Sequence, residues 1–437
     1  MTRSLADIQE LRTVLGRLNA ERRAAAGASS RHETQYVKRA ERFHRKLALE
    51  VESRQGKARV LITGQIGVGK SSELWRFISD QRRQANHQWI IACDLEKQEH
   101  PERCSATGVL LTIFRDCWAS GRNRLYNRHT LDNLRTKILE RLIDWLKGNR
   151  VDDDKVLFEF GGMDFAVFLN RADDALSLIL GKAAQHEAVS EPSDRFGLVP
   201  DTLINLLNEF LDWLAEGNRR PLIVIDHVDK IRNRDAAEDV LVKSVPQWNR
   251  IRASIVMTAP YEHTLGELRD SIESKWGKPL MIYPVAIPAS LPSIVGSDLD
   301  PIFLDITKNA GLDALILPKS LSYLAYYSGG VLRTFVQFLI DACKEAHLSD
   351  KDKIDLLAAE SVVQSAQMAY KDFSIEDLKL LDRIATTDSG LGNASRLLRS
   401  PIGLLVRETP DGELQLRVHP LAETAIMKYR LRTEKVG

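Results

Sequence analysis

The chain has 437 residues, of which 44% are hydrophobic and 28% are charged, and its formal net charge is +1. This length allows two or three domains, and the composition is that of an ordinary globular protein. The balanced charge excludes a general electrostatic attraction to nucleic acid or to a membrane surface.

No export or membrane segment is predicted. Residues 1–15 lack the apolar stretch of a signal peptide, and no apolar run reaches the roughly 18 residues that span a bilayer. The four cysteines show no C-x-x-C spacing, which favours reduced, mostly buried thiols over a disulfide or a zinc site. We therefore expect a cytoplasmic protein without membrane contact.

Residues 1–57 are predicted to be helical and are basic, with 13 Lys and Arg against 7 Asp and Glu. A run of small residues at 24–30 indicates a break between two helices. The segment is either a partner-binding arm or a solvated helical face that leads into the core domain.

Residues 64–71 read G-x-x-x-x-G-K-S, the phosphate-binding P-loop. An apolar, β-branched strand pattern at 59–63 precedes the loop and a helical pattern begins at 72. Such a loop surrounds phosphate oxygens with backbone N–H groups, and the helix N-terminus adds positive potential. Lys70 is predicted to reach the β- and γ-phosphates, and Ser71 to ligate Mg²⁺. The residues predicted to bind ATP in this segment are Gly64, Gln65, Ile66, Gly67, Val68, Gly69, Lys70, Ser71 and Ser72.

A second core strand is predicted at 89–95, and amphipathic helices at 110–118 and 131–146. Charge runs and small residues at 147–200 indicate an insertion or a mobile loop. A strong helix is predicted at 201–215.

Residues 221–226 form an apolar run that ends in Asp226, the pattern of a Walker B strand. A carboxylate at the carboxyl end of a buried strand can bind Mg²⁺, directly or through water. Asp229 follows three residues later. It is either the group that polarises the attacking water or a structural loop carboxylate.

The next predicted strand, 253–258, ends in Thr258, a polar residue placed to sense the γ-phosphate. Alternating strand and helix patterns from 59 to 285 predict an α/β fold with a mostly parallel sheet, covered by helices on both faces. This is the P-loop NTPase class.

The remainder is predicted to be helical, with helices at 318–327 and 331–346. Arg333 lies at the start of the second helix, where it either reaches the nucleotide phosphates or is a surface arginine. Residues 371–431 are typical of a winged helix. They comprise a helix at 374–385 capped by Ser374 and Asp377, a short helix at 395–398, a hairpin with strands at 403–408 and 413–418, and a terminal helix from Pro420.

Four regions are predicted from these patterns. A helical arm covers 1–57 and the P-loop ATPase core covers 58–290, including the insertion at 147–200. A helical lid covers 291–370 and the winged-helix domain covers 371–437.

The motifs together resemble the STAND branch of the AAA-type P-loop ATPases over roughly residues 36 to 431, most strongly at GQIGVGKS (64–71) and LIVIDHVDK (222–230). In this family a second acid follows the Walker B aspartate by three residues, as Asp229 follows Asp226. Many AAA+ motors have glutamate directly after that aspartate. Here the position is His227, which implies slow hydrolysis.

The resemblance also implies roles for two later residues. In SGGVLR, Arg333 corresponds to the sensor 2 arginine. In RVHPLA, His419 corresponds to a histidine that contacts the ADP β-phosphate, although Pro420 replaces the usual aspartate. The other interpretation of His419 is a buried histidine that links the hairpin and the last helix.

Two functions are compatible with these motifs. The first is a regulatory ATPase with Mg²⁺ that binds ATP or ADP, hydrolyses slowly, and assembles with itself or controls a separate effector protein, as in bacterial anti-phage defence and regulatory systems of this family. Possible trans-acting residues are Arg250, Arg252 and Arg269. The second is ATP-dependent DNA binding or loading through the winged helix. Acidic residues mixed with the arginines of that segment favour protein contacts over DNA.

Overall fold

The computed structural model describes residues 41–54, 56–83, 89–97, 104–122, 141, 201–215, 221–287, 299–369, 373–387, 397–398, 400, 403–408 and 414–434. The chain forms two compact units. The sheet unit contains Arg42–Thr63 and Glu73–Leu280, and the C-terminal unit contains Gly64–Ser72 and Met281–Gly437. The predicted arm before residue 41, the helix at 131–146 except Arg141, and the insertion at 147–200 lie outside the described residues. The four predicted domain ranges stay predictions.

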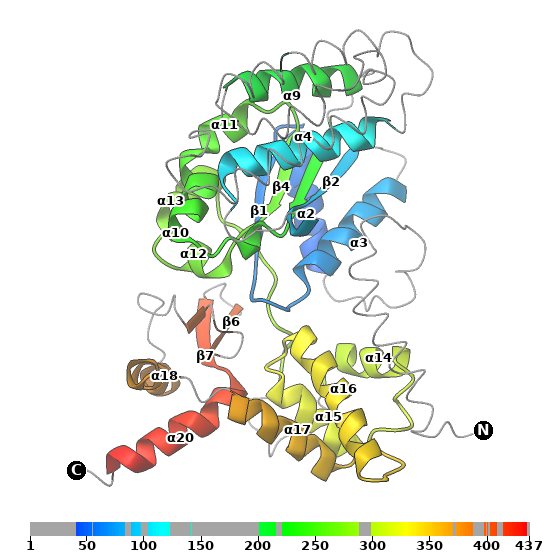
Figure 1. Cartoon of the computed structure of the whole chain (residues 1–437), viewed down its shortest axis with the longest axis vertical. Coiled ribbons are helices and arrows are strands. Elements are labelled where there is room, and N and C mark those ends of the chain that lie inside the picture. The colour runs from blue at the N-terminus through cyan, green and yellow to red at the C-terminus, as the bar shows by residue number, and fades with distance from the viewer. Residues whose placement is uncertain are drawn as a thin grey trace, which may run out of the picture. The chain divides into compact units, whose positions relative to one another are not determined.

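A five-stranded sheet in the order β2-β3-β4-β1-β5 organises the sheet unit (Figure 1). Its strands are β1 (Arg59–Thr63), β2 (Ile90–Asp94), β3 (Leu222–Asp226), β4 (Ser254–Thr258) and β5 (Leu280–Met281). β1 to β4 pair in parallel, and every residue of β1, β3 and β4 is buried. Parallel strands buried on both faces read as continuous apolar runs, and that is the pattern by which they were predicted. The mostly parallel α/β P-loop fold is therefore confirmed.

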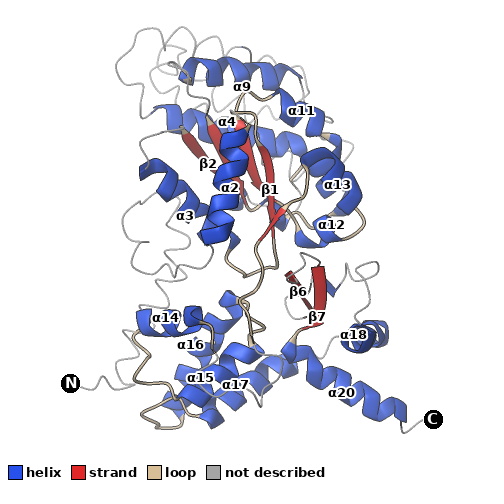
Figure 2. Ribbon diagram, turned by 180° about the vertical axis from the view of Figure 1, so that it is seen from behind, coloured by secondary structure: helices blue, strands red, loops and turns tan. Residues whose placement is uncertain are grey.

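Helices cover both faces of this sheet. α2 (Glu41–Ser53) lies over one face and α4 (Ala106–Arg122) over the other (Figures 1 and 2). On the α4 side, Phe210 lies with its ring centroid 6.3 Å from Phe114 and 5.1 Å from Trp118, within the main hydrophobic core. The other described helices of this part are α3 (Lys70–Arg83), α9 (Asp201–Leu214), α10 (Arg234–Glu238), α11 (Val245–Arg250), α12 (Tyr261–Leu265) and α13 (Arg269–Trp276), with short 3-10 turns η3 (Leu95–Lys97) and η5 (Val228–Lys230) and a π-helical turn η6 (Asp239–Lys243).

A buried arginine fixes the amino end of β1. Arg59 is only 7% exposed, and its guanidinium donates hydrogen bonds of 2.6 to 3.0 Å to the carbonyls of Trp248, Ile251 and Ala253. Two of these carbonyls belong to the carboxyl end of α11 and the residue after it, where a helix leaves its last carbonyls without partners inside the helix. Burial lowers the pKa of Arg59 to about 10, so the group is still charged at neutral pH. The favourable carbonyl dipoles offset the cost of burying that charge.

Arg59→Ala should lower the free energy of unfolding by about 3 kcal/mol or more, because several buried carbonyls lose a charged donor. Chemical denaturation measures the loss. The matched control is Arg252→Ala, whose side chain is 62% exposed and pairs with Asp212. The control should change stability by less than about 1 kcal/mol. Equal effects of the two substitutions would contradict a special role for Arg59.

The C-terminal unit is mainly helical. Its described helices are α14 (Pro301–Asn309), α15 (Pro318–Tyr327), α16 (Leu332–Leu348), α17 (Leu356–Ala369), α18 (Ile375–Thr387) and α20 (Pro420–Glu434). A second hydrophobic core joins α14 to α17 and includes Leu421. Strands β6 (Leu404–Glu408) and β7 (Leu414–Val418) form an antiparallel hairpin. The predicted helices near 318–327, 331–346 and 374–385 and the predicted hairpin are confirmed.

The predicted helix cap is also present. Ser374 Oγ accepts a hydrogen bond from the Asp377 N–H at 3.1 Å, and Asp377 Oδ2 accepts from the Ser374 N–H at 3.1 Å. These two bonds form the reciprocal pair of a capping box. Of the predicted short helix at 395–398, only 397–398 are described, and both residues are helical. The identification of this region as a winged helix stays a prediction.

The four cysteines are buried and none forms a disulfide, as predicted. Among the described helices, none is both long enough and apolar enough to cross a membrane.

Candidate functional site

The P-loop, Gly64 to Ser71, follows β1 directly and turns tightly. The Val68 N–H donates to the Gln65 carbonyl at 3.3 Å. Gly67 and Gly69 have φ values of +88° and +102°, a backbone region that favours glycine. Lys70 begins α3 and is 6% exposed, and its Nζ donates to the carbonyl of Gly64 at 2.8 Å and to that of Gln65 at 3.2 Å. The predicted phosphate-binding ammonium group therefore lies against its own loop.

The P-loop packs against the start of α16, within the C-terminal unit. The main-chain N–H of Arg333 donates to the Gly67 carbonyl at 3.1 Å. A Cβ atom on Gly67 would lie 2.9 Å from Arg333 Cβ, and one on Gly64 would lie 2.4 Å from the Ile282 carbonyl oxygen. Both positions therefore require glycine because neighbouring chain fills the space. Arg333 is placed beside the predicted phosphate loop through its backbone, whereas its side chain is exposed. Its contact with phosphate stays a prediction.

The segment after β5 is held at two further points. The Val285 N–H donates to the Gly330 carbonyl at 2.9 Å, and a Cβ atom on Gly330 would lie 1.9 Å from the Val285 carbonyl oxygen. Further along, the Arg407 guanidinium of β6 donates to the Ile287 carbonyl at 3.4 Å. The segment from 281 to 287 thus links the P-loop, the turn before α16, and the hairpin.

His419 is fully buried between the hairpin and α20. Its Nδ1 accepts from the Leu421 N–H at 3.2 Å, so Nε2 carries the ring proton and donates to the Ser328 carbonyl at 3.2 Å. Burial, partly opposed by the bond to Ser328, lowers the pKa of His419 to about 3 and keeps the imidazole neutral. This is the arrangement of the second interpretation, a buried histidine that links elements. The predicted contact with the ADP phosphate stays a prediction.

Gly329→Ala should destabilise the protein by about 2 kcal/mol more than Gly277→Ala. Both glycines have positive φ, +65° and +79°. A Cβ atom on Gly329 would lie 2.5 Å from His419 Nε2, whereas one on Gly277 would meet nothing within 4 Å. Overpacking of this kind typically costs about 1 to 3 kcal/mol. Thermal and chemical unfolding compare the two variants, and equal losses would show that backbone strain alone matters.

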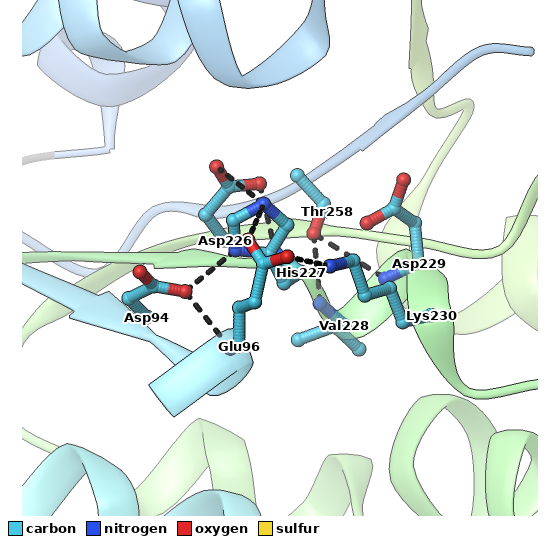
Figure 3. Close-up of polar contacts among 8 residues, drawn as sticks. All are labelled: Asp94, Glu96, Asp226, His227, Val228, Asp229, Lys230 and Thr258. Carbon is cyan, nitrogen blue, oxygen red and sulfur yellow. Dashed lines mark hydrogen bonds and ion pairs between the residues drawn. The ribbon is translucent and has the colours of Figure 1, made fainter. Parts of the chain in front are cut away.

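In the sheet unit, acidic residues end neighbouring strands (Figure 3). Asp94 ends β2 and Asp226 ends β3, and the two are partners in the parallel register. Asp226 is 6% exposed, and its Oδ1 accepts from the main-chain N–H of His227 at 2.8 Å. The carboxylate predicted to bind Mg²⁺ therefore has a second carboxylate beside it, which the sequence analysis did not identify.

His227 joins these acids. Its φ is +67°, in the left-handed region, and its Nδ1 lies 2.6 Å from Asp94 Oδ1. Its Nε2 lies 3.4 Å from Glu96 Oε2 and 3.8 Å from Asp226 Oδ2. Burial disfavours the charged ring, but the bond to Asp94 and the nearby carboxylate of Asp226 outweigh burial and raise the pKa of His227. The imidazole of His227 is therefore held in place among several carboxylates.

Lys230 and Thr258 complete this edge. Lys230 Nζ lies 2.5 Å from Glu96 Oε1, and this hydrogen bond lowers the pKa of Glu96. Thr258, at the end of β4, is fully buried, and its Oγ1 accepts from the N–H groups of Val228 at 3.0 Å and Asp229 at 3.4 Å. Thr258 therefore holds the turn that carries Asp229. Its predicted sensing of the γ-phosphate, and the catalytic role of Asp229, stay predictions.

Thr258→Val should cost about 1 to 3 kcal/mol, because the buried N–H of Val228 and the partly buried N–H of Asp229 lose their acceptor. It should also speed hydrogen exchange at the amides of Val228 and Asp229. Thr258→Ser keeps the hydroxyl and is the control. If exchange at these two amides is unchanged in Thr258→Val, the threonine does not hold the turn.

The three arginines predicted as possible trans-acting residues each form an ion pair inside this chain. Their partners are, in order, Asp201 for Arg250, Asp212 for Arg252 and Glu273 for Arg269. A role in trans would require these surface pairs to open. Such pairs contribute little to stability, so this requirement is modest.

No family model matches the chain, and no curated protein matches it. Solved structures do. The Holliday junction branch migration motor RuvB of Thermotoga maritima is 12% identical, covering 89% of this chain and 95% of that chain, with a TM-score of 0.35. The ORC2 protein of Aeropyrum pernix is 13% identical, covering 91% and 94%, with a TM-score of 0.41. A Walker-type ATPase of Pyrococcus abyssi is 12% identical, covering 91% and 99%, with a TM-score of 0.44. The function of this chain therefore has to be inferred from its own residues.

Proposed function

We propose that this protein is a slow regulatory ATPase whose conformation or assembly follows the bound nucleotide and thereby controls a partner protein. The observation that carries the proposal is the packing of the P-loop inside the C-terminal unit. Gly67 accepts a hydrogen bond from Arg333, and Gly64 lies against Ile282. If the P-loop changes conformation when it binds phosphate, its contacts can pass that change directly to α16 and to the segment after β5.

The contacts continue from the loop to the end of the chain. The turn before α16 contains Gly330, which holds Val285, and Gly329, which lies under the ring of His419. His419 in turn precedes α20. Packed contacts with two discrete arrangements can carry a local change over such distances, since close-packed elements do not deform continuously. This chain of contacts supports a switch in which α20 and the hairpin respond to the nucleotide.

The residues fit a magnesium nucleotide. The P-loop offers glycine backbone with positive φ for close approach to phosphate, and Lys70 offers a cation. Ser71 and Asp226 provide the hydroxyl and carboxylate oxygens that Mg²⁺ prefers. When bound, Mg²⁺ would neutralise charge on the phosphates of ATP. In the protein itself, Asp229 is our candidate for orienting the attacking water.

Protein partners are favoured over DNA for the hairpin. Arg407, one of its arginines, is half-buried and donates to the Ile287 carbonyl, which commits it to an internal contact. Burial lowers its pKa to about 10. A DNA-reading surface instead presents exposed cations to phosphates. The place of the protein in anti-phage defence is proposed from the family resemblance, and self-assembly or an effector protein would be its output.

Lys70→Ala should lose tight ATP binding, because the phosphates lose their principal cation. Fluorescent-nucleotide titration measures the affinity. Light scattering after size-exclusion chromatography, with ADP or a non-hydrolysable ATP analogue, should show a nucleotide-dependent change in mass or shape for the wild type and none for Lys70→Ala. Unchanged ATP affinity in Lys70→Ala would overturn the ATPase proposal.

The second arm of this experiment separates binding from hydrolysis. Asp229→Asn should bind ATP with wild-type affinity and hydrolyse it at least about tenfold more slowly, as expected when a group acts only in the transition state. Wild-type hydrolysis in Asp229→Asn would leave the binding proposal intact but remove Asp229 from the mechanism. A wild type that binds ATP without any change in mass or shape would argue against the switch.

A further inference from the structure

Three potential metal ligands meet at the carboxyl edge of the sheet, from two segments far apart in the sequence (Figure 3). One ligand atom from each of Asp94, Glu96 and His227 lies within 4.8 Å of the others. Oxygen atoms alone are the usual ligands of Mg²⁺. An imidazole added to carboxylates makes a donor set suited to ions such as Mn²⁺ and Zn²⁺.

We propose that Asp94, Glu96 and His227 form a binding site for a divalent transition-metal ion. This site is distinct from the predicted Mg²⁺ ligands Ser71 and Asp226. It does not depend on the proposed ATPase function, because all three donors lie in the sheet unit and the site needs no nucleotide.

Neighbouring contacts orient the side chains of the three proposed ligands. Asp94 Oδ1 accepts from the main-chain N–H of Glu96 at 2.9 Å, which fixes the Asp94 carboxylate relative to the backbone of Glu96. Lys230 Nζ contacts Glu96 Oε1 at 2.5 Å, while Glu96 Oε2 lies 3.4 Å from His227 Nε2. The lysine therefore occupies one oxygen of Glu96 and the other faces the imidazole. Outer contacts of this kind orient the ligands of metal sites.

The local charge favours a cation. Asp94, Glu96 and Asp226 place three carboxylates around one imidazole, and Lys230 is the cation paired with them among the described contacts. The guanidinium of Arg115 also interacts electrostatically with Asp94, but its hydrogen bond, at 2.9 Å, is to Asp116. The site therefore carries more acidic than basic side chains, and a divalent ion would neutralise the excess.

The site can be reached by an ion from solution. Glu96 is 55% exposed, whereas Asp94 and His227 are 19% and 17% exposed. An ion about 2.0 to 2.2 Å from each donor would replace the 2.6 Å hydrogen bond between Asp94 Oδ1 and His227 Nδ1, so these two atoms would move slightly apart while Glu96 moves toward the ion. Glu96 is the most exposed donor and has the longest side chain, so its rotation can supply most of that adjustment. The two less exposed donors would provide the fixed part of the site.

The test is titration of the nucleotide-free full chain with Mn²⁺, followed by the electron paramagnetic resonance signal of free Mn²⁺. The wild type should bind one equivalent per chain and keep it in excess Mg²⁺. Asp94→Asn and His227→Asn should each weaken Mn²⁺ binding by at least about tenfold. Asparagine is chosen at 227 because it tolerates the left-handed backbone there.

Two control variants separate the site from general attraction and from the nucleotide site. Asp229→Asn removes the same charge two residues from His227 and should change Mn²⁺ affinity by less than about twofold. Lys70→Ala should bind Mn²⁺ like the wild type. Circular dichroism confirms that each variant is folded. The proposal is overturned if the wild type binds no stoichiometric Mn²⁺, if excess Mg²⁺ displaces it, or if Asp229→Asn loses as much affinity as Asp94→Asn.

Discussion

The parallel register of the strands is the constraint on which the sheet unit depends. Pairing of Asp94 with Asp226, and of Ile225 with Met257, brings the ends of β2, β3 and β4 to one level. Because the carboxyl ends of parallel strands share an edge, polar residues placed there lie near one another. A slip by one residue would reverse the direction of these side chains and disperse the group.

The C-terminal unit depends on a different constraint, the close approach of backbone to backbone. Gly64, Gly67 and Gly330 each lie where a Cβ atom would overlap a neighbouring segment. At Gly64 and Gly330 the neighbouring atom is a main-chain carbonyl oxygen, and at Gly67 it is the Cβ atom of Arg333, so a shift of one segment is passed directly to the other. The proposed switch therefore rests on glycines that are not themselves expected to contact nucleotide, as well as on those of the P-loop.

Much of this could be predicted from the sequence, where the signals are local. The strand ending at Asp226 is a continuous apolar run, and the P-loop is a spacing of glycines and Lys70 within eight residues. The group of Asp94, Glu96 and His227 could not be found this way, because the register between β2 and β3 is a long-range property. The one available hint was that Asp94 ends a predicted strand, as Asp226 does. The left-handed backbone of His227 has no sequence signature, since histidine at that place is merely tolerated.

The contact between Gly329 and His419 has a consequence for how this chain can vary. The ring lies where any Cβ atom at 329 would stand, and it is held there through both of its nitrogens. The residue types allowed at these two positions therefore depend on each other, although the positions are 90 apart in the sequence. A larger residue at 329 becomes acceptable only after the imidazole has been exchanged for a smaller side chain. Such an exchange leaves the Ser328 carbonyl and the Leu421 N–H without the hydrogen bonds that His419 makes. A protein that carries only this first substitution is therefore less stable.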